Sequence, residues 1–154
     1  PAPFDRYGVQ VPGIKKLGKL LGDKMPVWVS TPEADLFQMA TDYDPALIQA
    51  TQDGQTLPLS DNHRLTFIHT PGHTGGSQCL LINEDRLLTG DTLFPGSCGR
   101  CDLPGGDPHA LWNSLQQRLA SLPPATAIFP GHGYGGRLMS EISVELEGGQ
   151  LRPI

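Results

Sequence analysis

The chain has 154 residues, which is enough for one compact domain. Its formal net charge of −5 argues against a broad phosphate-binding surface and hence against nucleic-acid binding. No apolar run approaches the roughly 18 to 20 residues of a membrane span, and residues 1–6 carry no signal-peptide pattern, so we predict a cytoplasmic protein without a membrane partner.

The first third of the chain predicts helices around one short strand. Residues 14–22 favour an amphipathic helix because Ile14, Leu17 and Leu21 share one helical face. Residues 26–30 are rich in β-branched and aromatic side chains and predict a strand, followed by a helix whose start is marked by Thr31-Pro32. We expect a further helix over residues 45–50.

The remainder predicts short strands interrupted by one well-marked helix. The expected strands cover 57–59, 64–69, 77–82, 86–90 and 125–129, with a turn at 83–85. The helix begins at Asp107-Pro108 and directs four leucines inward, at positions 111, 115, 119 and 122. A last helix is expected over 138–147. Strands mixed with helices and no repeat period indicate a single layered α/β or α+β domain over 1–154.

Three cysteines, an odd number, do not form a disulfide framework. Cys98 and Cys101 have the CxxC spacing of zinc and redox sites. A structural zinc site would need two further ligands that Cys79 alone does not supply, and no βαβ start precedes the motif. We therefore predict free thiols.

Three glycine-containing segments follow predicted strands and carry metal-ligand side chains. They are Gly72-His73, Gly90-Asp91 and Gly131-His132. Each could be unremarkable alone, the histidines as surface residues and Asp91 as a turn or helix cap. Together they offer two imidazoles and a carboxylate beside residues that let the backbone approach an ion closely. Such a set suits Zn²⁺, Fe²⁺ or Mn²⁺.

The segments that surround these residues resemble the metallo-β-lactamase superfamily, and most closely its glyoxalase II and persulfide dioxygenase-like branch. The similarity covers about residues 12–145, in the family order. It is carried by four segments: residues 67–77 (FIHTPGHTGGS), 88–94 (LTGDTLF), 98–107 (CGRCDLPGGD) and 129–134 (FPGHGY).

The resemblance implies an αββα sandwich with a metal site along one sheet edge. His73 and His132 would each ligate a metal, and Asp91 would be the catalytic residue that bridges two metals or ligates one. The implied cofactor is zinc, one or two ions per complete site, with iron or manganese as alternatives. A metal-bound hydroxide would then hydrolyse a thioester such as an acyl-glutathione.

Two further residues are expected to contact the substrate, a small-molecule thioester or glutathione conjugate. Arg100 could bind a substrate carboxylate or, alternatively, form a structural salt bridge. Tyr134 follows the His132 segment and could line the pocket. We expect His63, His69 and His109 to be structural or exposed.

The sequence departs from the family pattern at its N-terminal end. The signature H-x-H-x-D-H is absent, and aligning residues 12–17 with the family places Asp5, Tyr7, Val9 and Gln10 where its ligands stand. Alternatively, residues 1–13 are an atypical leader. The upstream strands of the sandwich are missing too, so we expect a homodimer, a complementing chain or a rearranged packing to cover an apolar sheet face.

Three functions remain open. The first is a metal-dependent hydrolase of glyoxalase II type. The second is a non-catalytic or crippled family member with a partial metal site, and the third is an iron-dependent persulfide dioxygenase. Because half of the ligands are lacking, we expect this chain by itself to hold less than one tightly bound metal ion and to be inactive.

Overall fold

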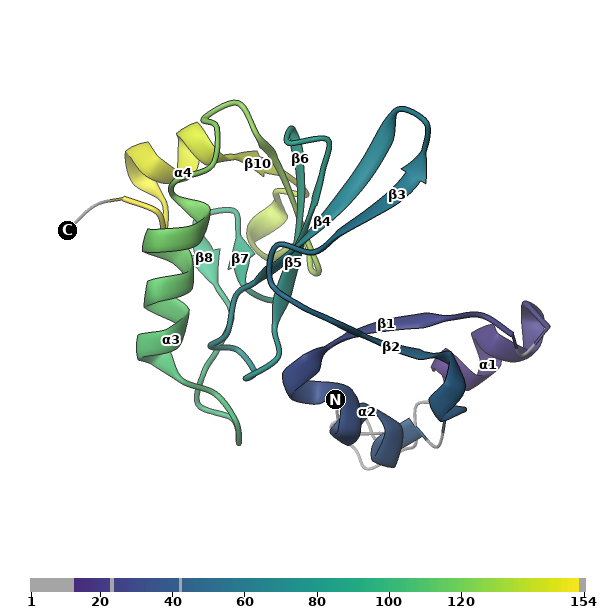
Figure 1. Cartoon of the computed structure of the whole chain (residues 1–154). Coiled ribbons are helices and arrows are strands. Elements are labelled where there is room, and N and C mark those ends of the chain that lie inside the picture. Colours follow the sequence, from purple (N-terminus) through teal and green to yellow (C-terminus); the bar gives the residue numbers. More distant parts are fainter. Residues whose placement is uncertain (1–12, 23, 42, 153–154) are drawn as a thin grey trace. The chain divides into compact units, whose positions relative to one another are not determined.

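The computed structural model describes residues 13–22, 24–41 and 43–152 (Figure 1). The predicted leader, with Asp5, Tyr7, Val9 and Gln10, therefore lies outside the described residues except for Gly13. The chain divides into two compact units, Pro1–Thr51 and Gln52–Ile154. The single domain over 1–154 stays a prediction.

The first unit contains α1 (Gly13–Leu20), β1 (Val27–Ser30), α2 (Ala34–Thr41) and β2 (Ile48–Thr51). The helix predicted over residues 45–50 is wrong. Asp44 caps a single 3-10 turn over Pro45–Leu47, and the chain then extends as β2. The reason is tertiary, since β2 pairs in parallel with β1 along its whole length.

Helix α1 confirms the predicted helix at its N-terminal end and stops two residues earlier than expected. Two leucines of its predicted apolar face are exposed, Leu17 by 44% and Leu21 by 59%. The amphipathic pattern is therefore present without full burial of its apolar side chains.

A six-stranded sheet forms the second unit. Its strands are β3 (Thr56–Ser60), β4 (His63–His69), β5 (Gln78–Ile82), β6 (Arg86–Gly90), β9 (Ala127–Pro130) and β10 (Ser140–Glu141), in the order β10-β9-β6-β5-β4-β3. The five longer strands confirm the predicted ones to within about two residues. Neighbours pair antiparallel except β6 and β9, which run parallel.

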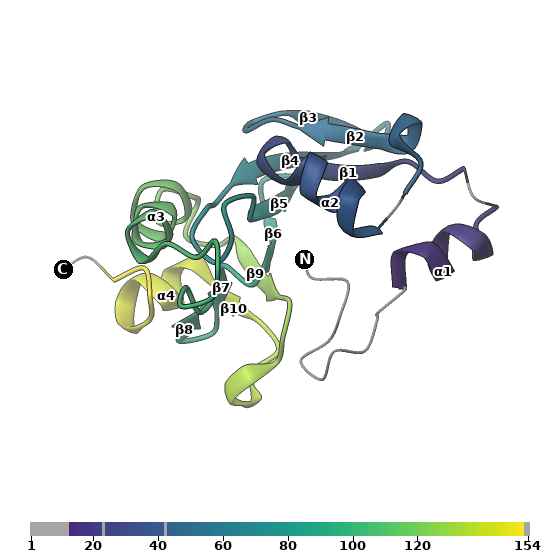
Figure 2. The ribbon, with the colours of Figure 1, turned by 90° about the horizontal axis from the view of Figure 1, so that it is seen from below.

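The parallel pair needs a crossover, and helix α3 (Pro108–Asn113) provides it together with its π-helical continuation η3 (Ser114–Leu119). Asp107 caps α3 by accepting hydrogen bonds from the backbone N–H groups of His109 and Ala110. Figure 2 shows α3 and α4 (Ile142–Gly148) on the same side of the sheet. The last helix starts later than predicted because residues 140–141 pair with β9 as β10.

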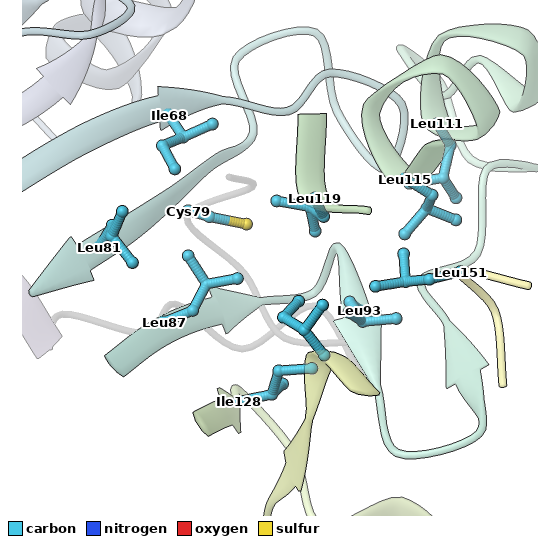
Figure 3. Packing of buried hydrophobic residues seen from close by; sticks show 11 residues of the cluster. Ile68, Cys79, Leu81, Leu87, Leu93, Leu111, Leu115, Leu119, Ile128 and Leu151 are labelled. Carbon is cyan, nitrogen blue, oxygen red and sulfur yellow. The ribbon is translucent and has the colours of Figure 1, made fainter. Parts of the chain in front are cut away.

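The core of the second unit lies between this sheet and the helices (Figure 3). The predicted inward leucines of the crossover helix are in it: Leu111, Leu115 and Leu119 are buried, and Leu122 packs against the cluster. They meet sheet residues that include Cys79 and Leu87, both without exposed surface. This packing fixes the sheet edge at which the polar segments emerge.

The structure is a mixed α/β fold, as predicted. Among the described residues, none of the helices has the length and apolar character needed to cross a membrane.

Candidate metal centre

The three polar segments leave the sheet at one edge. Strands β4 and β6 both pair antiparallel with β5, so they run in the same direction, and β9 runs parallel to β6. The C-terminal ends of these three strands therefore lie at the same edge. His73 follows β4, Asp91 follows β6 and His132 follows β9. Strand direction thus brings residues far apart in the sequence to one edge of the sheet.

The His73 loop is held against the start of α3. Gly72 has φ +143°, and a Cβ at this position would lie 2.3 Å from Leu111 Cα, so no larger residue fits. The Gly72 carbonyl accepts a hydrogen bond from Asp107 N at 2.8 Å, and the Pro71 carbonyl accepts one from Ser114 Oγ at 2.8 Å. The crossover helix thus positions the turn that carries His73.

The loops that carry Asp91 and His132 are joined directly. Gly131 N donates a hydrogen bond to the Gly90 carbonyl at 2.8 Å, which extends the parallel pairing of β6 and β9 to the residue that follows β9. A Cβ at Gly131 would lie 2.9 Å from Asp91 Oδ1. Glycine is therefore needed where the His132 loop passes the carboxylate.

Buried threonine hydroxyl groups form hydrogen bonds that connect the loops of the site. Thr70 Oγ1 lies 3.0 Å from Thr92 Oγ1 and 3.4 Å from Cys79 Sγ, which connects the residues just before the His73 turn and just after Asp91. Thr89 Oγ1 donates to the Leu93 carbonyl at 2.7 Å. Because each hydroxyl has a partner, these buried polar groups stabilise the loops.

The three predicted ligand residues converge on the carboxylate of Asp91. His73 Nε2 lies 3.6 Å from Asp91 Oδ2, and His132 Nε2 lies 3.3 Å from Oδ1. The aspartate side chain is 34% exposed, so it is partly open to solvent. Across the described ranges, no group of three or more His, Cys, Asp or Glu side chains surrounds a single point as a metal ion would require. Their role as ligands therefore stays a prediction.

The donor types are nevertheless those that ligate metal ions. His73 Nδ1 lies 2.7 Å from the Arg100 carbonyl, which can only accept, so Nδ1 carries the proton. In the neutral ring, Nε2 then turns its lone pair towards a carboxylate oxygen. Two electron-rich atoms this close repel each other unless a cation or a proton lies with them.

A pocket of about 380 Å³ opens over these groups. Part of its wall is a short hairpin, β7 (Leu93–Phe94) and β8 (Ser97–Cys98), which sequence analysis did not predict. Phe94 and Ser97 line the pocket and were likewise missed. Strands of two residues give no periodic signal, and the family-like segments 88–94 and 98–107 marked this region without indicating a hairpin.

Both predicted substrate contacts line the pocket. Arg100 forms a two-pronged ion pair with Asp102, with Nε–Oδ1 and Nη2–Oδ2 distances of 2.7 Å, and the hydrogen bond from Arg100 lowers the pKa of Asp102 to about 2. A substrate carboxylate would have to compete for that edge of the guanidinium. Tyr134 stacks on His132 at 5.0 Å between ring centroids, and Phe94 meets Tyr134 edge-on at 5.2 Å.

The prediction of free thiols is confirmed for all three cysteines. Burial raises the pKa of Cys79 to about 11. Burial also raises the pKa of Cys98, and the neighbouring Cys101 raises it further. Cys98 lines the pocket, whereas Cys79 lies in the core.

These differences predict the order of alkylation by iodoacetamide. A raised pKa means less thiolate at a fixed pH, and only the thiolate reacts, so labelling of Cys98 near pH 8 is expected to be slow and to increase with pH beyond the ordinary thiol range of about 8.5. Cys79 is expected to react only after unfolding. Peptide mapping by mass spectrometry measures both rates, and labelling of Cys79 as fast as Cys98 in the folded chain would contradict this expectation.

Comparison with known proteins decides the family. The family model described as the metallo-beta-lactamase superfamily matches residues 5–132, which is most of the chain. The chain belongs to this superfamily. A probable polyketide biosynthesis zinc-dependent hydrolase, BaeB of Bacillus velezensis, is 36% identical over 71% of the chain and 46% of its own length.

Other superfamily members show the same relationship. A hydroxyacylglutathione hydrolase of Nitrosococcus oceani is 43% identical over 53% of the chain and 31% of its own length. The crystal structure of a metallo-beta-lactamase from Staphylococcus aureus matches 92% of the chain and 44% of its own chain, with a TM-score of 0.76 and 25% identity. The chain thus spans less than half the length of each of these superfamily proteins, and it is a mixed α/β member of a family of metallo-hydrolases.

Proposed function

We propose that the pocket over Asp91 is a metal-dependent hydrolytic centre of glyoxalase II type, with a thioester such as an acyl-glutathione as its substrate. One observation carries this proposal: two imidazoles from separate loops turn their Nε2 atoms towards opposite oxygens of one carboxylate, at 3.6 and 3.3 Å. The hydroxyacylglutathione hydrolases among the relatives support the substrate class.

His73, Asp91 and His132 would hold the metal ion, with zinc favoured by the zinc-dependent hydrolases among the relatives. A zinc ion in such a site supplies Lewis-acid chemistry, activating water and polarising a carbonyl group. The ring stacking between Tyr134 and His132 orients the imidazole and excludes water from one of its faces. The pocket volume is within the range of small-molecule sites, so it can accept the acyl part of a thioester.

Arg100 supplies positive charge at the pocket wall. A carboxylate of a glutathione conjugate would exchange for Asp102 on the guanidinium, because both groups bind it with the same two-pronged geometry. That exchange orients the thiol part of the substrate while the thioester carbonyl faces Asp91. Because the Arg100–Asp102 ion pair is exposed, breaking it costs little free energy.

The test measures thiol release from an acyl-glutathione by the purified protein with added Zn²⁺, together with its metal content by elemental analysis. Hydrolysis above the zinc-only background that disappears with a chelator supports the proposal. Thiol release that is indifferent to the chelator contradicts it. For the 154-residue chain tested by itself, we expect less than one tightly held ion per protomer, and two ions would overturn that expectation.

The absence of three donors around one point, within the part of the chain that the structure describes, favours one alternative. A non-catalytic member with a partial site would show measurable zinc binding without thiol release. An iron-dependent persulfide dioxygenase would instead consume oxygen with a persulfide after loading with Fe²⁺. The same preparations distinguish the three functions.

A further inference from the structure

We infer that the main chain of Gly99 and Arg100 is the element that positions two of the three proposed ligands, His73 and Asp91. This inference rests on the proposed function and deepens it, because it concerns how the same pocket prepares its donors before a metal ion binds. Gly99 and Arg100 follow β8 directly and line the pocket. Their main-chain atoms contact both residues.

The contact with His73 selects one form of its ring. The Arg100 carbonyl accepts a hydrogen bond from Nδ1 at 2.7 Å, so the neutral ring keeps its proton on Nδ1. Nε2 is then the unprotonated nitrogen, and it is the atom that lies 3.6 Å from Asp91 Oδ2. A carbonyl that fixes the tautomer in this way is a typical outer-shell partner of a metal-binding histidine.

The contact with Asp91 depends on the absence of a side chain. A Cβ at Gly99 would lie 1.8 Å from the Asp91 carbonyl oxygen and 3.4 Å from His73 Cβ. Gly99 N also donates a hydrogen bond to the Thr92 carbonyl at 3.3 Å. Any larger residue must therefore push this segment away from Asp91, and the Arg100 carbonyl would move with it.

The positioning role belongs to the main chain and not to the Arg100 side chain. The guanidinium is turned to Asp102 and is exposed. Arg100→Ala removes that ion pair but keeps the carbonyl that holds His73. The two substitutions at neighbouring positions therefore separate the effect of the backbone from the effect of the charge.

The experiment determines the His73 tautomer in the metal-free protein by ¹⁵N NMR at mildly alkaline pH, where imidazole is neutral. Zn²⁺ affinity is measured in parallel by competition with a chromophoric chelator. We expect the Nδ1–H form in the parent protein and in Arg100→Ala. In Gly99→Ala we expect a mixture of tautomers and an affinity weaker by roughly 10- to 100-fold.

Gly148→Ala is the matched control, because a Cβ there meets nothing within 4 Å and the residue does not line the pocket. It should change neither the tautomer nor the affinity. Thermal unfolding of all variants separates a local effect from a loss of fold.

Two results would overturn the inference. One is an Nε2–H tautomer in the parent protein, and the other is a folded Gly99→Ala with unchanged tautomer and affinity. If Gly99→Ala does not fold, the tautomers of the parent protein and of Arg100→Ala still test the inference. Loss of the Nδ1–H form in Arg100→Ala would show that the Arg100 side chain, and not its carbonyl, positions His73. Absence of thioester hydrolysis with the tautomer effects intact would refute the proposed function alone.

Discussion

Replacing Asp91 by asparagine is expected to weaken Zn²⁺ binding by more than 100-fold and to remove any thioester hydrolysis. The carboxylate is the group on which both imidazoles converge. Asparagine keeps its shape, which matters because Gly131 packs closely against Oδ1. It removes the negative charge and replaces one acceptor by a donor. The loss should exceed the roughly 10- to 100-fold typical of an outer-shell partner.

Chelator competition measures the affinity, and thiol release measures the activity. Asp102→Asn is the matched control, because it removes an acidic residue that pairs with Arg100 and does not itself line the pocket. It should leave Zn²⁺ affinity within a few-fold of the parent. Binding by Asp91→Asn as tight as in the parent protein would refute the assignment of Asp91 as a ligand.

Replacing Glu145 by alanine is expected to destabilise the protein by about 3 kcal/mol, a large share of an ordinary domain's stability. The side chain is 1% exposed. Its oxygens accept hydrogen bonds from Ser140 Oγ at 2.7 Å, from Gly96 N at 3.1 Å and from Gln150 N at 3.4 Å. Alanine would leave these donors without their acceptor and would create a cavity.

Because Gly96 lies in the turn between β7 and β8, the same substitution should also loosen the hairpin that forms part of the pocket wall. Urea unfolding measures the free-energy change. Glu147→Ala, an exposed position on the same helix, is the control and should change stability by less than about 0.5 kcal/mol. Equal midpoints for the two variants would show that the buried carboxylate is not a structural anchor.

Periodicity identified much of the second unit correctly. The inward leucines of the crossover helix and the strands that became β3, β4, β5, β6 and β9 were predicted because the spacing of apolar residues follows secondary-structure geometry. Periodicity failed where strand pairing decided the secondary structure. Residues 48–51 form a strand because β1 is available to pair with them, and local propensity carries no information about that partner.

The site shows the same division. His73, Asp91 and His132 could be selected from the sequence because glycine precedes each of them and a strand precedes each glycine. Phe94 and Ser97 could not, because their hairpin is too short for a pattern. The covering of an apolar sheet face by a second copy or a complementing chain stays a prediction, as does the role of each ligand.

The sequence by itself determined which chemical groups this protein offers and the family whose motifs they compose: two imidazoles, one carboxylate and the glycines that let them approach. Only the tertiary structure decided how they face one another. Strand direction brings the three loops to one sheet edge, and the Arg100 carbonyl lies within hydrogen-bond distance of His73 Nδ1. Strand pairing and this contact both involve residues distant in sequence, so no local sequence pattern could specify either of them.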